Sequence, residues 1–248
     1  MNFQIGIAGR TIEIHSLFDK AGSYCKGYLI PETERKASDI LIEITEADLE
    51  RERAAVQLEN LRTGLKVSCA PEDLEVSAAY RKIATQVTSF DTFMMHGSVI
   101  STSGNGYMIT APSGTGKTTR SRLWVKCIPD SVIVNGDKPL VRVADSGVYA
   151  YGTPWCGKEG WNVNMAVPLQ AIFLLERSEE GNQMTEISFA EAFPLLLHQT
   201  FRPDDPDAKR KTLQLLRAMA GKIRVYRFCS EPTAEAVRMA WEKAGEQG

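Results

Sequence analysis

The sequence lacks the features that would place it in a secreted, membrane-spanning or zinc-binding class. No stretch approaches the ~20 apolar residues of a membrane span, and residues 1–14 alternate like a strand rather than forming a signal peptide. A disulfide framework or structural zinc site is not expected, and a reducing cytoplasm fits best, because the cysteines are scattered and form no C-x-x-C pair. These five cysteines are Cys25, Cys69, Cys127, Cys156 and Cys229.

The chain also has no large excess of positive or negative charge. The 29 Lys and Arg residues and 31 Asp and Glu residues give a formal net charge of -2. No global field therefore favours nucleic acid or an anionic membrane as a partner. With 43% hydrophobic and 24% charged residues, the 248-residue chain has the composition of a globular protein that can form a main domain and a small second one.

Three regions of an α/β protein are predicted along the chain. Residues 1–65 form a small β-rich region, with strands at 3–8, 10–14, 24–30 and 39–44 and one charged, helix-prone segment at 47–61. Residues 66–92 form a connecting helix, because apolar residues recur at spacings of four and three, and we expect it to pack on the main sheet. Residues 93–248 form the main domain.

The main domain is predicted to alternate strands with helices. Helices are expected at 118–126, after the S-x-x-E box that begins at Ser188, after Asp205-Pro206, and at 232–243. We expect segment 183–187 to pair with segment 171–175 in the sheet. The predicted strands are 106–111, 131–134, 140–143, 148–151, 171–175, 183–187 and 223–228.

Residues 111–118, A-P-S-G-T-G-K-T, read as a phosphate-binding loop with Ala in place of the usual first Gly. The glycines allow backbone N–H groups to converge on a triphosphate, Lys117 can reach its β- and γ-phosphates, and the Thr118 hydroxyl suits Mg²⁺. The predicted strand before the loop and helix after it are the context that this motif requires. The predicted nucleotide contacts are Ser113, Gly114, Thr115, Gly116, Lys117, Thr118 and Thr119.

Three further features narrow the chemistry: His96, Asp137, and the loop at 152–164 with Lys158 and Glu159. Each also has a structural interpretation. His96 could be a strand histidine bonded to backbone, Asp137 could be a turn residue of N-G-D, and Lys158 could be a solvated loop tip.

Four other residues carry similar alternatives. Arg202 could lie in a surface turn, and His198 fits a helix face better than a catalytic role. Trp155 and Trp161 could stack on a ligand or anchor the loop in the core.

The stretch from His96-Gly-Ser-Val-Ile to the glycine loop resembles the catalytic core of HPr kinase/phosphorylase, whose P-loop fold is shared in part with phosphoenolpyruvate carboxykinases. Residues 132–137 fall where that family has a strand ending in paired aspartates, and 157–164 fall near its signature loop. Three segments look closer to a bacterial HPr-kinase-like branch similar to peptide serine kinases: N-G-D-K-P, G-T-P-W-C-G-K and H-Q-T-F-R-P. The resemblance covers residues 93–175 and implies an HPr-kinase C-terminal-domain-like P-loop fold.

The resemblance also implies transfer of the γ-phosphoryl of ATP to a hydroxyl, that of a serine in a peptide or protein. Lys117 and Mg²⁺, held by Thr118 and Asp137, would neutralise the phosphates. Asp137 would alternatively accept the hydroxyl proton, with His96 beside the γ-phosphate. Lys158 and Arg202 would stabilise the transferring group.

Gly136 departs from the family pattern, because an aspartate is expected there. Only Asp137 remains, so either Asp137 does both jobs, or another acid such as Glu159 helps, or catalysis is weakened. The rival functions are a nucleotide-binding regulator or a small-molecule kinase. The regulator predicts that Gly136→Asp restores turnover, whereas the small-molecule kinase predicts a closed pocket under loop 152–164. The sequence leaves open the acceptor, ATP against GTP, the reverse reaction and a homo-oligomer.

Overall fold

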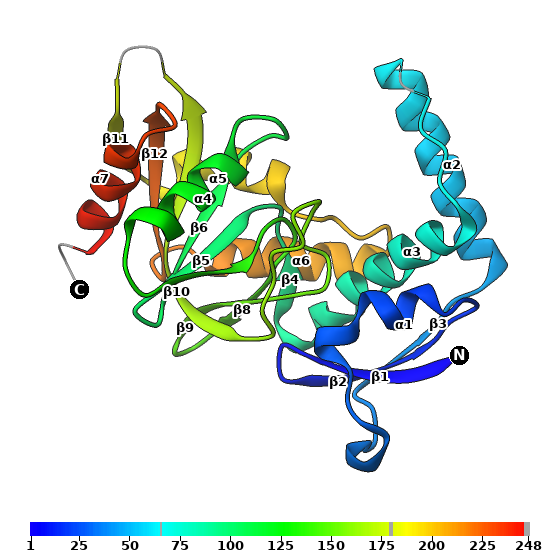
Figure 1. Ribbon diagram of the computed structural model, residues 1–248. Coiled ribbons are helices and arrows are strands. Elements are labelled where there is room, and N and C mark those ends of the chain that lie inside the picture. Colours follow the sequence, from blue (N-terminus) through cyan, green and yellow to red (C-terminus); the bar gives the residue numbers. More distant parts are fainter. Residues whose placement is uncertain (65, 179–180, 246–248) are drawn as a thin grey trace. The chain divides into compact units, whose positions relative to one another are not determined.

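The computed structural model describes residues 1–64, 66–178 and 181–245, and the chain divides into two compact units, Met1–Gln86 and Val87–Gly248 (Figure 1). Both units mix helices with strands. The predicted region boundaries at residues 65 and 248 lie outside the described residues. Across the described ranges, no helix has the length and apolar character needed to cross a membrane.

The first unit is built on a three-stranded sheet in the order β1-β2-β3. Strands β1 and β2 are antiparallel and turn at Ala8 and Gly9, as predicted, and β3 pairs in parallel with β2. The alternation of isoleucines places Ile12 and Ile14 of β2 and Ile42 of β3 in the core. The strands are β1 (Asn2–Ile7), β2 (Arg10–His15) and β3 (Ile40–Glu43).

The predicted strand at 24–30 is wrong, because this segment forms helical turns. Helix α1 (Lys20–Tyr24) is followed by the 3₁₀ turn η1 (Lys26–Tyr28), and a second 3₁₀ turn, η2 (Glu32–Glu34), comes later. Local backbone bonds from Cys25 N to Ala21 O (3.1 Å) and from Tyr28 N to Cys25 O (2.8 Å) replace a strand ladder. The turns bury Cys25 and Tyr28. An isolated bridge joins Leu29 to β1, and Ile30 N donates to Gln4 O at 2.8 Å.

Two longer helices complete the first unit. Helix α2 (Glu46–Thr63) covers the predicted helix at 47–61, and α3 (Pro71–Gln86) packs against α1, α2 and β3. Ion pairs fasten α3 to α2: Lys82 lies 2.7 Å from Asp48, and Arg81 lies 2.7 Å from Glu52. The helix that was expected to connect the two regions thus belongs to the first unit, because it packs against α1, α2 and β3 there.

The second unit contains a curled, mixed sheet in the order β4-β8-β9-β10-β6-β5-β7. The long strand β10 pairs first with β9 in antiparallel fashion and then with β6 in parallel, after a register shift between Leu169 and Ala171. These seven strands are β4 (Thr92–Met94), β5 (Ser98–Thr102), β6 (Asn105–Thr110), β7 (Ser131–Asn135), β8 (Leu140–Ala144), β9 (Gly147–Tyr151) and β10 (Ala166–Arg177).

Strands β11 (Gln183–Ile187) and β12 (Arg224–Ser230) correct one predicted pairing. Strand β11 pairs with β12 rather than with β10. Both edges of β10 are already occupied between Ala171 and Leu174, by β6 on one side and β12 on the other, each parallel to it. Strand β11 therefore pairs with the free edge of β12. The residues close to β11 in sequence do not indicate this pairing, because β12 lies far along the chain.

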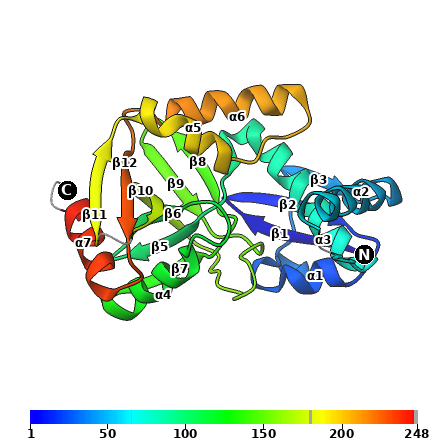
Figure 2. The ribbon, with the colours of Figure 1, turned by 90° about the horizontal axis from the view of Figure 1, so that it is seen from above.

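Helices cover both faces of this sheet, with α4 and α7 on one face and α5 and α6 on the other (Figure 2). The predicted caps are present, since Ser188 accepts from Glu191 N at 3.2 Å and Asp205 accepts from Ala208 N at 2.8 Å. The unit begins with the 3₁₀ turn η3 (Val87–Phe90). The helices are α4 (Lys117–Cys127), α5 (Phe189–Gln199), α6 (Pro206–Ala218) and α7 (Ala234–Gly245).

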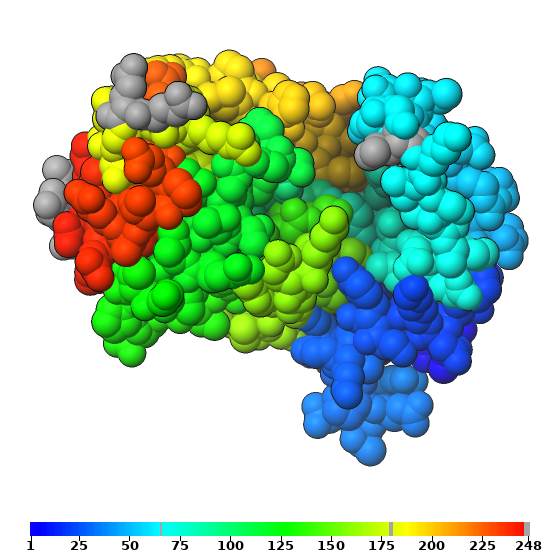
Figure 3. Space-filling view, turned by 45° about the horizontal axis from the view of Figure 1, so that its top comes forward, coloured from blue at the N-terminus to red at the C-terminus, as the bar shows by residue number. Residues whose placement is uncertain are grey.

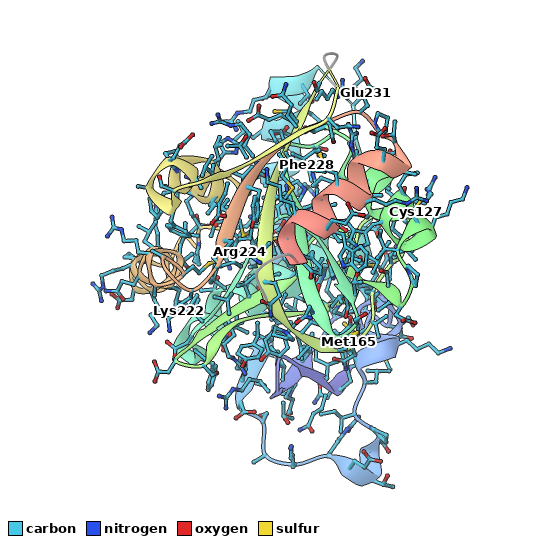
Figure 4. All side chains as sticks on the ribbon, turned by 90° about the vertical axis from the view of Figure 1, so that its left-hand side faces the viewer. Cys127, Met165, Lys222, Arg224, Phe228 and Glu231 are labelled. Carbon is cyan, nitrogen blue, oxygen red and sulfur yellow. The ribbon has the colours of Figure 1, made fainter. Side chains whose placement is uncertain are left out.

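The two faces have different cores. The α5/α6 face is mainly aliphatic, whereas the α4/α7 face stacks large rings from β6, α4, β10 and β12. Figure 4 shows α7 lying across this second face, with Arg224 and Phe228 at successive levels of β12. Trp124 is fully buried there, and its Nε1 donates to Thr102 Oγ1 at 2.9 Å. This hydrogen bond fixes the last turn of α4 against the end of β5.

Candidate active site

The loop at residues 111–116, hereafter the glycine loop, joins β6 to α4. Gly114 has a φ of 78° and Gly116 a φ of 111°, backbone conformations that side chains disfavour. A Cβ on Gly116 would also lie 2.3 Å from Arg120 Nη1. Gly116 is the N-cap of α4, and no side chain of the described residues caps this helix. The N–H groups of its first turn are therefore available to an anion.

The Lys117 ammonium turns back onto the glycine loop. Its Nζ donates to Ala111 O at 2.9 Å and to Pro112 O at 3.4 Å, and the side chain is buried. Burial lowers the pKa of Lys117, while the nearby Asp137 carboxylate acts in the opposite direction. Because hydrogen bonds between two charged groups are stronger than those to carbonyls, a phosphate could displace these loop acceptors.

Arg177, at the end of β10, was not identified from the sequence. Its guanidinium donates to Gly114 O at 2.5 Å and to Thr115 O at 3.5 Å. Strands β6 and β10 are parallel, so the glycine loop and Arg177 emerge at the same edge of the sheet. That proximity depends on strand pairing, and no sequence pattern near Arg177 indicates it.

His96 and Asp137 meet beside Lys117. His96 Nε2 lies 3.1 Å from Asp137 Oδ1, and the two side chains are 29% and 27% exposed. The backbones are tied as well, because Gly97 N donates to Asp137 O at 2.8 Å. Thr110 Oγ1 at the end of β6 donates to His96 O at 2.6 Å. The fold thus brings three predicted residues, His96, Lys117 and Asp137, to one place.

Gln199, which the sequence did not single out, holds the other side of the His96 ring. His96 Nδ1 lies 2.9 Å from Gln199 Oε1, and His96 N donates to Gln199 O at 2.7 Å. Phe201 N also donates to Met94 O at 3.0 Å, so the chain after α5 runs beside β4. Gln199 is 103 residues from His96, too far for any local signal to link them. Both ring nitrogens are held, which fixes the ring orientation.

The N-G-D turn is organised by Asn135 rather than by Asp137. The buried Asn135 Oδ1 accepts from Asp137 N at 2.9 Å and from Lys138 N at 2.7 Å, and its Nδ2 donates to Thr153 O at 2.9 Å. An asparagine that bonds the backbone two and three residues onward is typical of such turns. The Asp137 side chain is consequently free to face His96.

The Asp137 carboxylate is surrounded by positive charge. Burial alone would raise the pKa of Asp137, but the His96 hydrogen bond and the charges of Lys138 and Lys117 outweigh it and hold that pKa below its usual range. Lys138 Nζ lies 3.9 Å from Asp137 Oδ2. Asp137 is therefore ionised at neutral pH.

Gly136 has no room for a side chain. A Cβ there would lie 2.7 Å from Cys156 O, closer than side-chain atoms tolerate, and Gly136 N donates to Trp161 O at 3.0 Å. Loop 152–164 is fastened to β7 by a further bond, from Val163 N to Val134 O at 3.0 Å. An aspartate at position 136 would displace this loop, so Gly136→Asp does not test for a decayed active site.

The remaining predicted residues lie in segments that adjoin the His96–Asp137 pair. A Cβ on Gly157, which precedes Lys158, would lie 3.3 Å from Asp137 Cβ, and Phe201, which precedes Arg202, donates to Met94 O. Lys158 and Glu159 are exposed in the turn between Gly157 and Gly160. Arg202 is exposed after Phe201. Among the described residues, no hydrogen bond or ion pair joins Lys158 or Arg202 to Lys117, His96 or Asp137. These two positions stay predictions without local support.

The structure gives different outcomes for His198 and for the two tryptophans of loop 152–164. His198 is exposed near the end of α5, as expected for a helix-face residue. Trp155 is buried and anchors loop 152–164, whereas Trp161 is half-buried and carries the Arg122 guanidinium 5.4 Å from its ring centroid.

A dedicated metal cage is not found in the described parts of the chain, where no three His, Cys, Asp or Glu side chains cluster suitably. Magnesium does not require one, because it commonly uses one or two protein oxygens together with substrate phosphates and water. The Asp137 carboxylate and the Thr118 hydroxyl, half-buried in the first turn of α4, are oxygen donors of the kind this ion prefers. The donor chemistry therefore fits Mg²⁺.

Comparisons with known proteins add little to this geometry. No protein-family model matches the chain, and a search of curated proteins also finds no match. Among solved structures, the HPr(Ser) kinase/phosphatase from Coxiella burnetii aligns with 50% of this chain and 88% of its own, at 13% sequence identity and a TM-score of 0.28. A likeness of this size carries no activity over to the chain.

Proposed function

We propose that the protein transfers the γ-phosphoryl group of ATP to a serine hydroxyl of a peptide or protein. The observation that carries the proposal is the 3.1 Å contact between His96 and Asp137, placed beside Lys117 at the end of the glycine loop. A phosphate-binding element and an ionised carboxylate held in one orientation are the parts that phosphoryl transfer needs. The resemblance of residues 93–175 to HPr kinases points to the same reaction.

In the proposed mechanism, the glycine loop and the first turn of α4 bind the triphosphate. Lys117 leaves the carbonyl oxygens of Ala111 and Pro112 and pairs with the phosphate oxygens. Thr118 and Asp137 would hold Mg²⁺, which supplies further charge neutralisation when bound. Arg177, bonded to the glycine loop, and Lys138, beside Asp137, add positive charge at the rim of the site.

The acceptor hydroxyl lies next to Asp137 in this mechanism. Its oxygen forms a bond to the γ-phosphorus while the bond from that phosphorus to the β–γ bridging oxygen breaks, and ADP leaves. The hydroxyl proton passes to the Asp137 carboxylate. Asp137 is a weak base because its pKa is low, which suits a loose transition state in which the hydroxyl loses its proton late. His96 orients the carboxylate, and Gln199 orients His96.

The test is phosphate transfer from γ-labelled ATP with Mg²⁺, with host-cell extract as the source of acceptors. We expect a labelled peptide or protein band that disappears with Lys117→Ala and persists with Lys209→Ala, an exposed lysine on α6. Label confined to small molecules would favour the metabolite-kinase alternative instead. Absence of any transfer from a protein that binds ATP would contradict the proposal.

A nucleotide-binding regulator is the second candidate, and the packing of Gly136 favours it. The space that a second carboxylate would need is filled by Cys156 O and Trp161 O. Because Asp137 must then act both as metal ligand and as base, turnover could be too slow to matter. This candidate predicts ATP binding without transfer under the same conditions.

A further inference from the structure

A cavity of about 490 Å³ lies between α4, the edge strand β7 and loop 152–164. Helix α4 contributes residues at positions i, i+3 and i+4, which share one helix face. In Figure 3 the surface of α4 (green) adjoins that of loop 152–164 (yellow-green). The lining of the cavity includes Arg122, Val125, Lys126, Val132, Trp161 and Val163.

The lining combines apolar surface with positive charge. Val125, Val132 and Val163 are each more than a third exposed, which leaves their methyl groups available to a ligand. Arg122 and Lys126 supply two cations, and among the described residues that line the cavity there is no aspartate or glutamate. Asp130 and Glu159 are adjacent in sequence to lining residues, but they are not part of the lining. A ligand with aliphatic and carboxylate groups matches this surface.

The cavity is close to the proposed acceptor position. Gly136 N donates to Trp161 O at 3.0 Å, so the tryptophan wall is joined directly to the turn that carries Asp137. Val132 lies at the opposite end of the cavity and is five residues before Asp137. Five residues of a strand span at most ~16 Å. An extended peptide whose serine lies at Asp137 can therefore reach the cavity with residues up to about five positions away.

We propose that this cavity binds the segment of the acceptor that flanks its serine, and that it selects acidic and aliphatic side chains there. The proposal rests on the proposed function and names the substrate class of the same site. Carboxylates pair with Arg122 and Lys126, and aliphatic side chains pack on the three valines. The base of a nucleotide is a poorer match, because a neutral ring makes no use of the two cations.

Direct binding tests the proposal without requiring catalysis. Two fluorescein-labelled peptides are compared by anisotropy on protein carrying Lys117→Ala, each with a central serine. One has glutamates and valines three to five residues from the serine, and the other has lysines in place of the glutamates. We expect the acidic peptide to bind ~10-fold more tightly at low salt, with the difference shrinking as salt rises.

Charge reversal provides the decisive comparison. The variant Arg122→Glu/Lys126→Glu should invert the preference, so that the lysine peptide binds more tightly. The matched control Lys66→Glu/Lys209→Glu changes two exposed lysines outside the cavity by the same total charge and should keep the original preference. ATP affinity, measured in parallel on the parent and the two charge-reversal variants with Lys117 intact, should be the same in all three proteins.

Two outcomes would overturn the proposal. Equal binding of both peptides to the parent protein would show that the cavity does not select charge. Loss of ATP affinity in Arg122→Glu/Lys126→Glu, with peptide preference unchanged, would assign the cavity to the nucleotide base. An inverted peptide preference, together with no phosphate transfer by the protein that keeps Lys117, would support the docking site while contradicting the proposed function, so the two failures are distinguishable.

Discussion

Two loops flank the His96–Asp137 pair, and their glycines serve different purposes. In the glycine loop, a Cβ added to Gly114 would meet no atom within 4 Å, so the space beside it is open. In loop 152–164, a Cβ on Gly152 would lie 1.9 Å from Val163 O. Gly114 is needed for its positive φ, whereas Gly152 is needed because two backbone segments touch.

The difference shows how one residue type supports binding in one place and packing in another. An open loop with satisfied but exchangeable hydrogen bonds can accept a ligand without a change of fold. A loop whose backbone fills all available space instead holds neighbouring groups in position. Asp137 depends on both loops, because its charge interacts with Lys117 and its turn is covered by loop 152–164.

The largest expected effect comes from removing the group between the two loops. Asp137→Asn keeps the size of the side chain but cannot accept the hydroxyl proton. We predict that phosphate transfer falls by about 10²–10⁴-fold, the usual contribution of a general base. Transfer within about threefold of wild type would contradict the base role assigned to Asp137.

The substitution Lys117→Ala affects only the glycine loop. We predict a loss of transfer of about 10²–10³-fold or more, because a preorganised donor to the developing charge is removed. Thermal stability should change little, since the bonds lost are those of the Lys117 side chain to its own loop. A collapse of the melting temperature together with activity would mean that Lys117 has a structural role instead.

The substitution Gly152→Ala affects only loop 152–164. The added methyl group must displace the Val163 carbonyl, so we predict a destabilisation of about 1–3 kcal/mol, as for other overpacked sites. The matched control is Gly27→Ala, where a Cβ meets nothing within 4 Å. Chemical denaturation measures both, and equal effects of the two substitutions would contradict the close approach of the two segments.

The smallest effect is the pH dependence that Asp137 adds to stability. Its folded-state pKa is lowered, so its contribution is fully present above the unfolded value, about 3.9, and is lost as pH falls through the lower folded value. The difference in melting temperature between wild type and Asp137→Asn should thus be constant from neutral pH to about 5 and shrink below about 4. A difference that begins to shrink at pH 6 would contradict the lowered pKa.

The parts of the fold that local patterns determine were predictable. The β1–β2 turn at Gly9, the strand–loop–helix order around Gly114 and the caps at Ser188 and Asp205 each follow from residues a few positions apart. The 24–30 segment was misassigned because short apolar runs fit a strand or a helical turn equally well.

Long-range arrangements were predictable only in part. His96 and Asp137 were identified as candidates, but their 3.1 Å contact depends on the pairing of β5, which begins two residues after His96, with β7, which ends two residues before Asp137. Gln199 and Arg177 were missed, because each reaches the site through strand or segment pairing rather than through sequence spacing. The crowding at Gly136 was likewise invisible, since the atoms that fill the space come from loop 152–164.

In the proposed mechanism, the glycine loop binds the nucleotide while the His96–Asp137 pair acts on the acceptor. Calorimetric titration of ATP with Mg²⁺ into wild type, Lys117→Ala and His96→Gln tests this separation most directly. We predict that affinity falls at least ~10-fold in Lys117→Ala and stays within about threefold of wild type in His96→Gln, although His96→Gln transfers phosphate slowly. Equal affinity in all three proteins, or no ATP binding by the wild type, would contradict this division of roles.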